Sequence, residues 1–453
     1  MRKISYFISI AACLGYNGAC YSQKVSLPYE VGTWLGFRSA AISYTFDDNC
    51  PNQLAVALPM FDRYGFKLTL FAVSNFWSPN WSGLRSASLR GHEIGNHTAS
   101  HPSFRKETVN QQKREMSMAS DSINTQVPKQ KCSSFAYPGG DEGNDSLVAS
   151  YFVAARGEQG FIESSTPRNF MYISAVVCGT LGPIKSERDF RISAETVASS
   201  GGWLIYVIHG VDKDGGCSNL SSDTLRASLE YLNANREKFW TSTFGSVARY
   251  IKERNCVSVT ESYPESNDTS QYVARFQVDG IIRLQVTDSL DNEIYNVPIT
   301  IRRPLPPNWS SVVVKQNGLR IISSILRNGP TKYVMFDAVP NGGEIELVKE
   351  TMTGDDDVAL KGARNSNNNS LSQNFPNPFN PTTNIRFTVP RNGRTLLRVF
   401  NTLGQEVATL VNDMRNVGTY SVQWNASNLS SGTYYYRIQS GDLVEMKKMV
   451  LIK

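Results

Sequence analysis

The sequence predicts a multidomain protein: an α/β domain with a mainly parallel sheet, followed by two β-sandwich domains of immunoglobulin-like type. The chain has 453 residues, which is enough for two to four domains at roughly 100 to 200 residues each. Apolar residues make up 40% and charged residues 19%, so disorder over most of the length is excluded. Strand and helix patterns alternate as far as about residue 255, and only strand patterns follow.

The N-terminal segment, residues 1–22, has the pattern of a secretory signal peptide. Arg2 and Lys3 precede an apolar run over residues 4–14, and small residues flank a cleavage position before Gln23. The run is about half of the roughly 20 residues that a membrane-spanning helix needs, so we expect no transmembrane anchor. A lipoprotein signal with a lipid on Cys13 is the alternative interpretation.

Charge and cysteine content narrow the possible functions. The formal net charge is +6, a small surplus for this length, so nucleic acid is not expected as a partner. After the signal peptide the chain keeps five cysteines: Cys50, Cys132, Cys178, Cys217 and Cys256. An odd number leaves at least one thiol unbridged, and no pair has the close spacing of a zinc or redox motif. We expect buried or bridged structural cysteines.

The first folded region, residues 23–256, alternates strands and helices. Residues 41–46 are predicted as a strand, and the apolar face of a helix follows and ends at Gly65, where glycine permits a left-handed cap. Residues 66–73 form a second strand. Further helices are predicted near 106–124, 222–235 and 245–254, and further buried strands at 134–137 and 203–208. This order is typical of a parallel sheet, open or closed into a barrel.

The rest of the chain contains only strand patterns. Residues 257–355 are predicted to form a β-sandwich that acts as a spacer or as a glycan-binding module, with strands at 282–286, 297–301, 311–314, 333–336 and 345–348. A polar linker over residues 356–373 separates it from a second β-rich domain, residues 374–453. Strands there are predicted at 384–389, 396–400, 420–424, 433–438 and 446–452.

Carboxylates and imidazoles in the α/β region form the pattern of a metal site. Asp47 and Asp48 end the first predicted strand, where α/β active sites form. His97 and His101 are four residues apart, which places both imidazoles on one side of a helical turn, and imidazole nitrogen binds zinc at about 2.0–2.1 Å. Alone, the two aspartates are more typical of a turn or a helix cap, and the two histidines of surface or satisfied core residues. Together in one domain they indicate metal binding.

These motifs resemble those of the NodB-homology polysaccharide deacetylases, family 4 of the carbohydrate esterases, over about residues 30–255. Residues 45–48 match the first motif, residues 97–102 the second, and the apolar strand that leads to His209 matches the last. The resemblance implies a distorted (β/α) barrel. It also implies Asp48, His97 and His101 as metal ligands, Asp47 as general base and His209 as general acid. The metal implied is zinc, with cobalt or nickel as alternatives.

The third motif departs from the family pattern, which has an arginine that orients the base. Ala136 stands in its place here, followed by Tyr137, Pro138 and Gly139. Losing such a supporting group typically lowers metal affinity or activity by roughly 10- to 100-fold, which is less than the loss of a metal ligand would cause. We therefore expect an active enzyme with an altered pocket. Arg156 or Arg168 are the alternatives for the missing guanidinium. Gly139 would offer an oxyanion N–H, and Tyr137 would contact substrate.

The resemblance implies a secreted deacetylase that acts on an acetylated polysaccharide, either an N-acetylglucosamine polymer or acetylated xylan. A divalent ion lowers the pKa of bound water to about 7, a carboxylate removes the proton, and an imidazole protonates the leaving group. The alternative is a non-catalytic carbohydrate-binding or adhesive surface protein. Retention of all five motif side chains argues against that alternative.

The C-terminal region has a resemblance of its own, to the type A sorting domain of type IX secretion. It covers about residues 372–453. The matching segments are 374–381, 401–408, 431–436 and 447–453. This implies the type IX secretion machinery as a partner, passage across the outer membrane and a secreted or cell-surface location.

Overall fold

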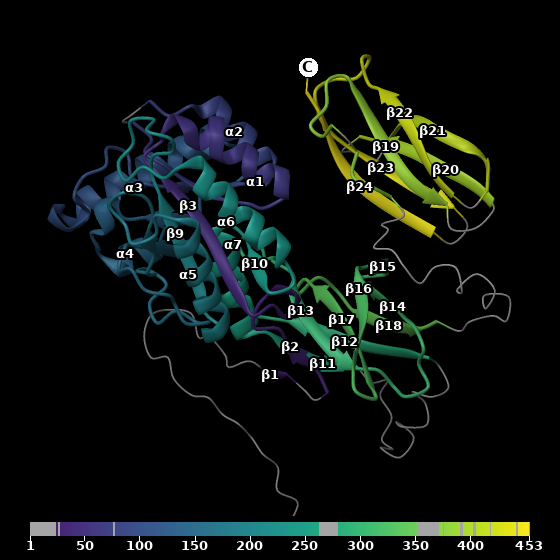
Figure 1. Cartoon of the computed structure of the whole chain (residues 1–453). Helices are drawn as coiled ribbons and strands as arrows, with labels where there is room; N and C mark the ends of the chain where they lie inside the picture. The colour runs from purple at the N-terminus through teal and green to yellow at the C-terminus, as the bar shows by residue number, and fades with distance from the viewer. Residues whose placement is uncertain are drawn as a thin grey trace, which may run out of the picture. The chain divides into compact units, whose positions relative to one another are not determined.

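The computed structural model describes residues 24–25, 28–75, 78–261, 280–350, 371–374, 376–389, 393–401, 405–416, 418–440 and 443–452. The chain falls into two compact units, Met1–Thr351 and Met352–Lys453 (Figure 1). The predicted signal peptide and most of the predicted linker lie outside the described residues. Among the described residues, no helix is long and apolar enough to cross a membrane.

A curled parallel sheet forms the centre of the first unit. Its strands run in the order β7-β6-β5-β4-β3-β9-β8, and β10 also pairs with β3. Every residue of β3 is buried, as expected for a parallel strand covered on both faces. The strands are β3 (Ala40–Asp47), β4 (Thr69–Ala72), β5 (Glu93–Asn96), β6 (Ser134–Ala136), β7 (Ala154–Arg156), β8 (Val176–Val177), β9 (Trp203–Ile208) and β10 (Phe239–Thr241).

Helices pack around this sheet (Figure 1). They are α1 (Leu58–Tyr64), preceded by a π-helical turn (Gln53–Ala57), α2 (Trp81–Leu89), α3 (Val109–Gln126), α4 (Asp145–Ala149), α5 (Glu187–Ser200), α6 (Ser222–Ala234) and α7 (Phe244–Cys256). Helix α1 ends at Gly65 with φ 68°, so the predicted left-handed cap is confirmed. Helix α5 begins with a capping box between Ser186 and Asp189.

Backbone hydrogen bonds bring the two ends of the curled sheet together. Gly157 N donates to Ile173 O at 2.9 Å, and Ile173 N donates to Ala155 O at 2.9 Å. The chain then continues into β8, which pairs with β9 at the opposite end of the strand order. This curvature fits the predicted distorted barrel, and it turns the carboxyl ends of the strands toward one rim.

Two further sheets complete the first unit. One has the order β1-β11-β12-β18-β14-β15, and the other has the order β16-β17-β13-β2. The strands are β1 (Lys24–Val25), β2 (Glu30–Val31), β11 (Ser258–Glu261), β12 (Ile281–Thr287), β13 (Ile299–Pro304), β14 (Val312–Gln316), β15 (Leu319–Arg320), β16 (Ser323–Asn328), β17 (Thr331–Ala338) and β18 (Ile345–Lys349). The N-terminal strands β1 and β2 thus pair with this later region. An immunoglobulin-like topology stays a prediction.

The second unit is also built from strands. Strands β19 (Thr382–Val389) and β22 (Gly418–Asn425) pair with each other, and the second sheet has the order β21-β20-β23-β24. The strands of that sheet are β20 (Gly393–Phe400), β21 (Glu406–Arg415), β23 (Gly432–Ser440) and β24 (Leu443–Leu451). Both sheets contribute to one apolar cluster, which includes Phe387 and Tyr436. The domain boundaries given above stay predictions.

Candidate metal centre

The predicted site residues lie at the carboxyl ends of strands of the parallel sheet. Asp47 is the last residue of β3, His97 follows β5, and His209 follows β9. Arg156 is the last residue of β7. Because carboxyl ends of parallel strands meet at one rim of the sheet, residues that are distant in sequence come together there.

Left-handed backbone positions turn the site loops inward. Asp48 has φ 72° and His101 has φ 59°, a conformation that residues other than glycine rarely adopt. The prediction of a helical turn over residues 97–101 is wrong, because Thr98 also has a positive φ of 68°. The loop is held instead by Glu115 on α3, whose Oε2 accepts hydrogen bonds from two consecutive backbone N–H groups, those of Ala99 and Ser100.

Asp48, His97 and His101 converge on one point. Nε2 of His97 and Nε2 of His101 each lie 3.4 Å from Asp48 Oδ1. One nitrogen or oxygen from each of the three residues lies within 4.8 Å of the others. Asp48 Oδ1 is buried and forms no hydrogen bond within the described part of the chain. Two imidazoles and an unsatisfied carboxylate oxygen are a donor set that fits a divalent cation such as zinc.

The orientation of His97 leaves Nε2 available to a cation. Its Nδ1 lies 2.8 Å from the backbone oxygen of Ala136, so Nδ1 carries the proton and donates it to that oxygen. A second ring nitrogen fixed by a carbonyl is typical of metal-binding histidines. Ala136, the residue at the position of the family arginine, therefore supports the site through its main chain.

Asp47 is fully buried next to this cluster, and its two oxygens differ. Oδ2 accepts a charge-assisted hydrogen bond from Arg156 Nη2, whereas Oδ1 has no hydrogen-bond partner among the described residues. Burial opposes ionisation of Asp47, but the nearby Arg156 guanidinium and His97 outweigh it and lower the pKa of this carboxyl. Asp47 is thus held as a carboxylate with one free oxygen.

The guanidinium beside Asp47 comes from Arg156 and not from Arg168. Arg156 is 0% exposed and lies 5.1 Å from the centre of the Phe71 ring. Arg168 is exposed. The sequence left these alternatives open because neither residue lies within a recognisable motif. The pairing becomes visible only when β7 takes its place in the sheet.

His209 faces the second carboxylate oxygen of Asp48, whereas His97 and His101 face the first. Its Nε2 lies 3.8 Å from Asp48 Oδ2, and its Nδ1 forms no hydrogen bond within the described residues. Sequence reasoning missed Glu158, whose carboxylate lies within 4.8 Å of ligand atoms of both Asp47 and His209. Glu158 follows β7 two residues after Arg156, and no sequence signal marked this position because the three residues of β7 show no periodicity.

Tyr137 and Gly139 lie on the loop after β6. The Tyr137 side chain is 0% exposed and packs against the rings of Phe104 and Phe135. The backbone N–H of Tyr137 donates to the backbone oxygen of Arg156. Gly139 has φ 59°, and a Cβ there would meet nothing within 4 Å, so the loop is open at this point. The oxyanion and substrate roles of both residues stay predictions.

The solved structures that are similar to this chain include three that cover about half of it. The Xyl-CE4 domain of a multidomain xylanase from the hindgut metagenome of Trinervitermes trinervoides is 18% identical, with TM-score 0.34, covering 46% of this chain and 88% of that one. A putative polysaccharide deacetylase from Mycobacterium smegmatis is 14% identical, with TM-score 0.39, covering 51% and 96%. A family 4 acetyl xylan esterase from Clostridium thermocellum with a cobalt ion is 18% identical, with TM-score 0.33, covering 46% and 89%.

Among curated proteins, a gellan lyase from a Bacillus species is 25% identical over 345 residues. The alignment covers 71% of this chain but only 13% of the length of that relative. Two family models match separate parts of the chain. Residues 37–152 match the polysaccharide deacetylase model, and residues 373–453 match the secretion system C-terminal sorting domain model. The chain therefore carries a domain of the polysaccharide deacetylase family and a C-terminal sorting domain of the secretion-system type.

Proposed function

We propose that this chain is a secreted, metal-dependent polysaccharide deacetylase that hydrolyses acetyl groups on an extracellular or cell-wall glycan. The observation that carries the proposal is the convergence of Asp48, His97 and His101 beside the free oxygen of Asp47. Asp48, His97 and His101 would hold the cation. When bound, a divalent cation supplies Lewis acidity to water and to the acetyl carbonyl.

The remaining chemistry is proton transfer by residues of the chain. Asp47 Oδ1 is the general base, because this oxygen is free to accept a proton while Arg156 fixes Oδ2. His209 is the general acid and donates its proton to the departing amine or sugar oxygen. A carboxylate oxygen of Glu158 and a ring nitrogen of His209 lie within 4.8 Å of each other, so Glu158 is placed to orient the imidazole.

The substrate proposed is an acetylated polysaccharide. N-acetylglucosamine polymers carry the acetyl group as an amide, and acetylated xylan carries it as an ester. Because one relative is named a gellan lyase, gellan is a further polymer to test. The sorting domain supports export by type IX secretion to the cell surface or the medium.

Acetate release tests this function. The purified chain is incubated with acetylated xylan, chitin oligomers and gellan that carries acetyl groups, each with zinc, with cobalt and after chelation. We expect acetate from at least one polymer with metal and a loss of at least tenfold after chelation. No acetate from any polymer under any metal would contradict the proposal and favour the carbohydrate-binding alternative.

A further inference from the structure

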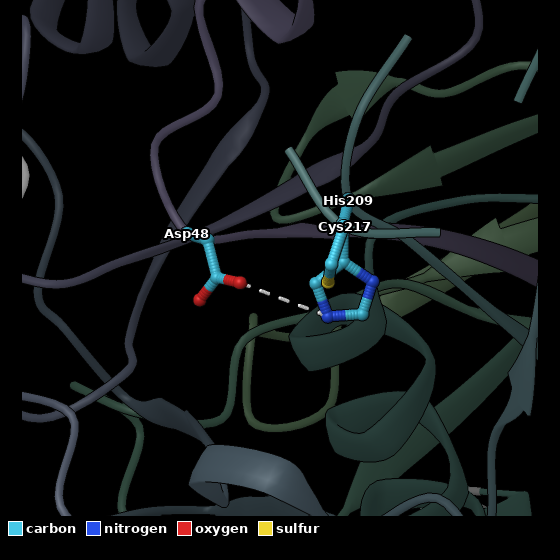
Figure 2. A group of neighbouring side chains, drawn as sticks. All are labelled: Asp48, His209 and Cys217. Carbon is cyan, nitrogen blue, oxygen red and sulfur yellow. Dashed lines mark ion pairs between the residues drawn. The ribbon is translucent and has the colours of Figure 1, made fainter. Parts of the chain in front are cut away.

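Cys217 lies beside the proposed active site, and the proposed mechanism does not use it. It belongs to the loop that follows His209, and its side chain is exposed. Its sulfur, a nitrogen of His209 and a carboxylate oxygen of Asp48 all lie within 4.8 Å of one another. Figure 2 shows the sulfur beside the His209 ring, with the ring turned toward an oxygen of Asp48.

The two oxygens of Asp48 face different partners. Oδ1 faces His97 and His101, each at 3.4 Å, whereas Oδ2 faces His209 at 3.8 Å. A carboxylate with donor groups on both sides has the arrangement of a bridging ligand, and paired metal sites in hydrolases lie about 3.5–4 Å apart. His209 is itself 9% exposed and its Nδ1 has no hydrogen-bond partner among the described residues, so no hydrogen bond from Nδ1 fixes the ring orientation.

We propose that Asp48, His209 and Cys217 form a second cation site that shares Asp48 with the first. A thiolate, an imidazole and a carboxylate are a ligand set that zinc accepts and that magnesium and calcium do not favour. The consequence for activity rests on the proposed function, because it depends on His209 being the general acid. The site itself rests only on the three side chains.

Small movements close this site around an ion. Two ligands on a tetrahedral zinc lie about 3.5 Å apart, given bonds of about 2.0–2.3 Å, so the three atoms need to approach by roughly 1 Å. The loop that carries Cys217 is anchored next to His209, because Gly210 N donates to Cys217 O at 3.1 Å. The sulfur therefore stays near the imidazole when the loop adjusts.

Ion binding at this site removes His209 from acid catalysis. The Cys217 S–H bond breaks, a sulfur–metal bond forms, and the proton passes to solvent, with no change in oxidation state. His209 Nε2 gives its lone pair to the ion and can no longer carry a proton to a leaving group. A second equivalent of zinc is therefore inhibitory, and the cysteine makes the enzyme sensitive to excess metal.

Cobalt titration tests the site independently of activity. The metal-free full chain under a phosphine reductant is titrated with Co²⁺, and bound ions and near-ultraviolet thiolate-to-cobalt absorption are measured. We expect two ions per chain, with the thiolate band appearing as the second ion binds. Cys217→Ser is expected to bind one ion without the band. Cys50→Ser changes a buried thiol next to Gly216, which is on the same loop as Cys217, and it is expected to keep both ions and the band.

Three results would overturn the second site. These are a single ion in the unaltered chain, a thiolate band that persists in Cys217→Ser, or a Cys50–Cys217 disulfide found by peptide mapping of the unreduced protein. Each of them leaves the deacetylase proposal intact. Conversely, two bound ions without acetate release under any condition would refute the deacetylase and leave the second site standing.

Zinc inhibition is the second readout. Acetate release is compared at one and at five equivalents of zinc. We expect a drop of about tenfold or more in the unaltered chain, because general acid catalysis contributes about 10²- to 10⁴-fold. In Cys217→Ser the ratio is expected to stay within about twofold. Equal inhibition of both proteins would show that excess zinc acts elsewhere.

Discussion

Asp47 and Asp48 are neighbours in sequence, yet their surroundings give them different chemistry. Asp48 turns away from the sheet in a left-handed conformation and faces three imidazoles. Asp47 stays in β3 and pairs with Arg156. The sequence identified Asp47, Asp48 and the histidines because each motif is local. It could not identify Arg156 as the partner or find Glu158, because only the pairing of β7 with β6 places them at the rim.

Arg156 is predicted to act as a positioning residue for Asp47. Arg156→Lys keeps a positive charge but loses the planar fork, so we expect kcat to fall roughly 10- to 100-fold with KM and zinc content unchanged. Arg168→Lys is the matched control, because Arg168 is exposed, and it is expected to leave kcat within twofold. Steady-state kinetics and metal analysis of both variants check this. Similar kcat values for the two variants would contradict it.

At the scale of elements, prediction succeeded where the pattern was long and local. The buried run of β9 and the apolar face that leads into α1 were recognised, as was the helix α7. Strand β7 was missed because three residues carry no periodicity. Helix α5 was missed although its capping box was readable from Ser186 and Asp189. Strand β16 is mostly exposed and so shows no alternation.

Helix α7 carries a buried acid that makes stability depend on pH. Glu253 is 0% exposed, and its Oε1 accepts a hydrogen bond from Val297 N at 3.0 Å. Burial raises the pKa of this carboxyl from its ordinary 4.5 to about 8. Between these values the folded chain holds a proton that the unfolded chain has released, so stability falls as pH rises, by at most about 1.4 kcal/mol per pH unit.

Glu253→Gln is therefore expected to reduce the decline in melting temperature between pH 5 and pH 8. Glutamine keeps the acceptor for Val297 N without an ionisable group. Differential scanning calorimetry of both proteins across this range checks the prediction. Glu293→Gln, an exposed acid, is the control and is expected to keep the decline of the unaltered chain. An unchanged slope in Glu253→Gln would contradict the assignment.

At the scale of the molecule, one apolar cluster joins the barrel domain to the β-region that follows it. Trp34, Tyr250 and Phe336 belong to this cluster, and Tyr250 Oη also donates to Gly32 O at 2.8 Å. Strand β2 pairs with β13, more than 260 residues away in sequence. The sequence could not predict this pairing, because a strand of two residues has no readable pattern.

We expect the first unit to be stable only with its β-region. A chain of residues 24–350 should keep its melting temperature and acetate release, because Met352–Lys453 is a compact unit distinct from the first. A chain of residues 24–257 exposes the shared cluster and loses about 1.5–3 kcal/mol for each large apolar side chain uncovered. It should melt at least 10 °C lower or aggregate. Equal melting temperatures of the two truncated chains would contradict a shared core.

The proposed deacetylase requires one cation held by Asp48, His97 and His101, with Asp47 free to act as the base. Tightly bound zinc is measured in Asp47→Asn and in His101→Ala, both in the Cys217→Ser background so that only this site is counted. We expect one zinc in Asp47→Asn, with acetate release about 10²- to 10⁴-fold lower, and no tightly bound zinc in His101→Ala. Full zinc in His101→Ala, or near-normal acetate release by Asp47→Asn, would contradict this requirement.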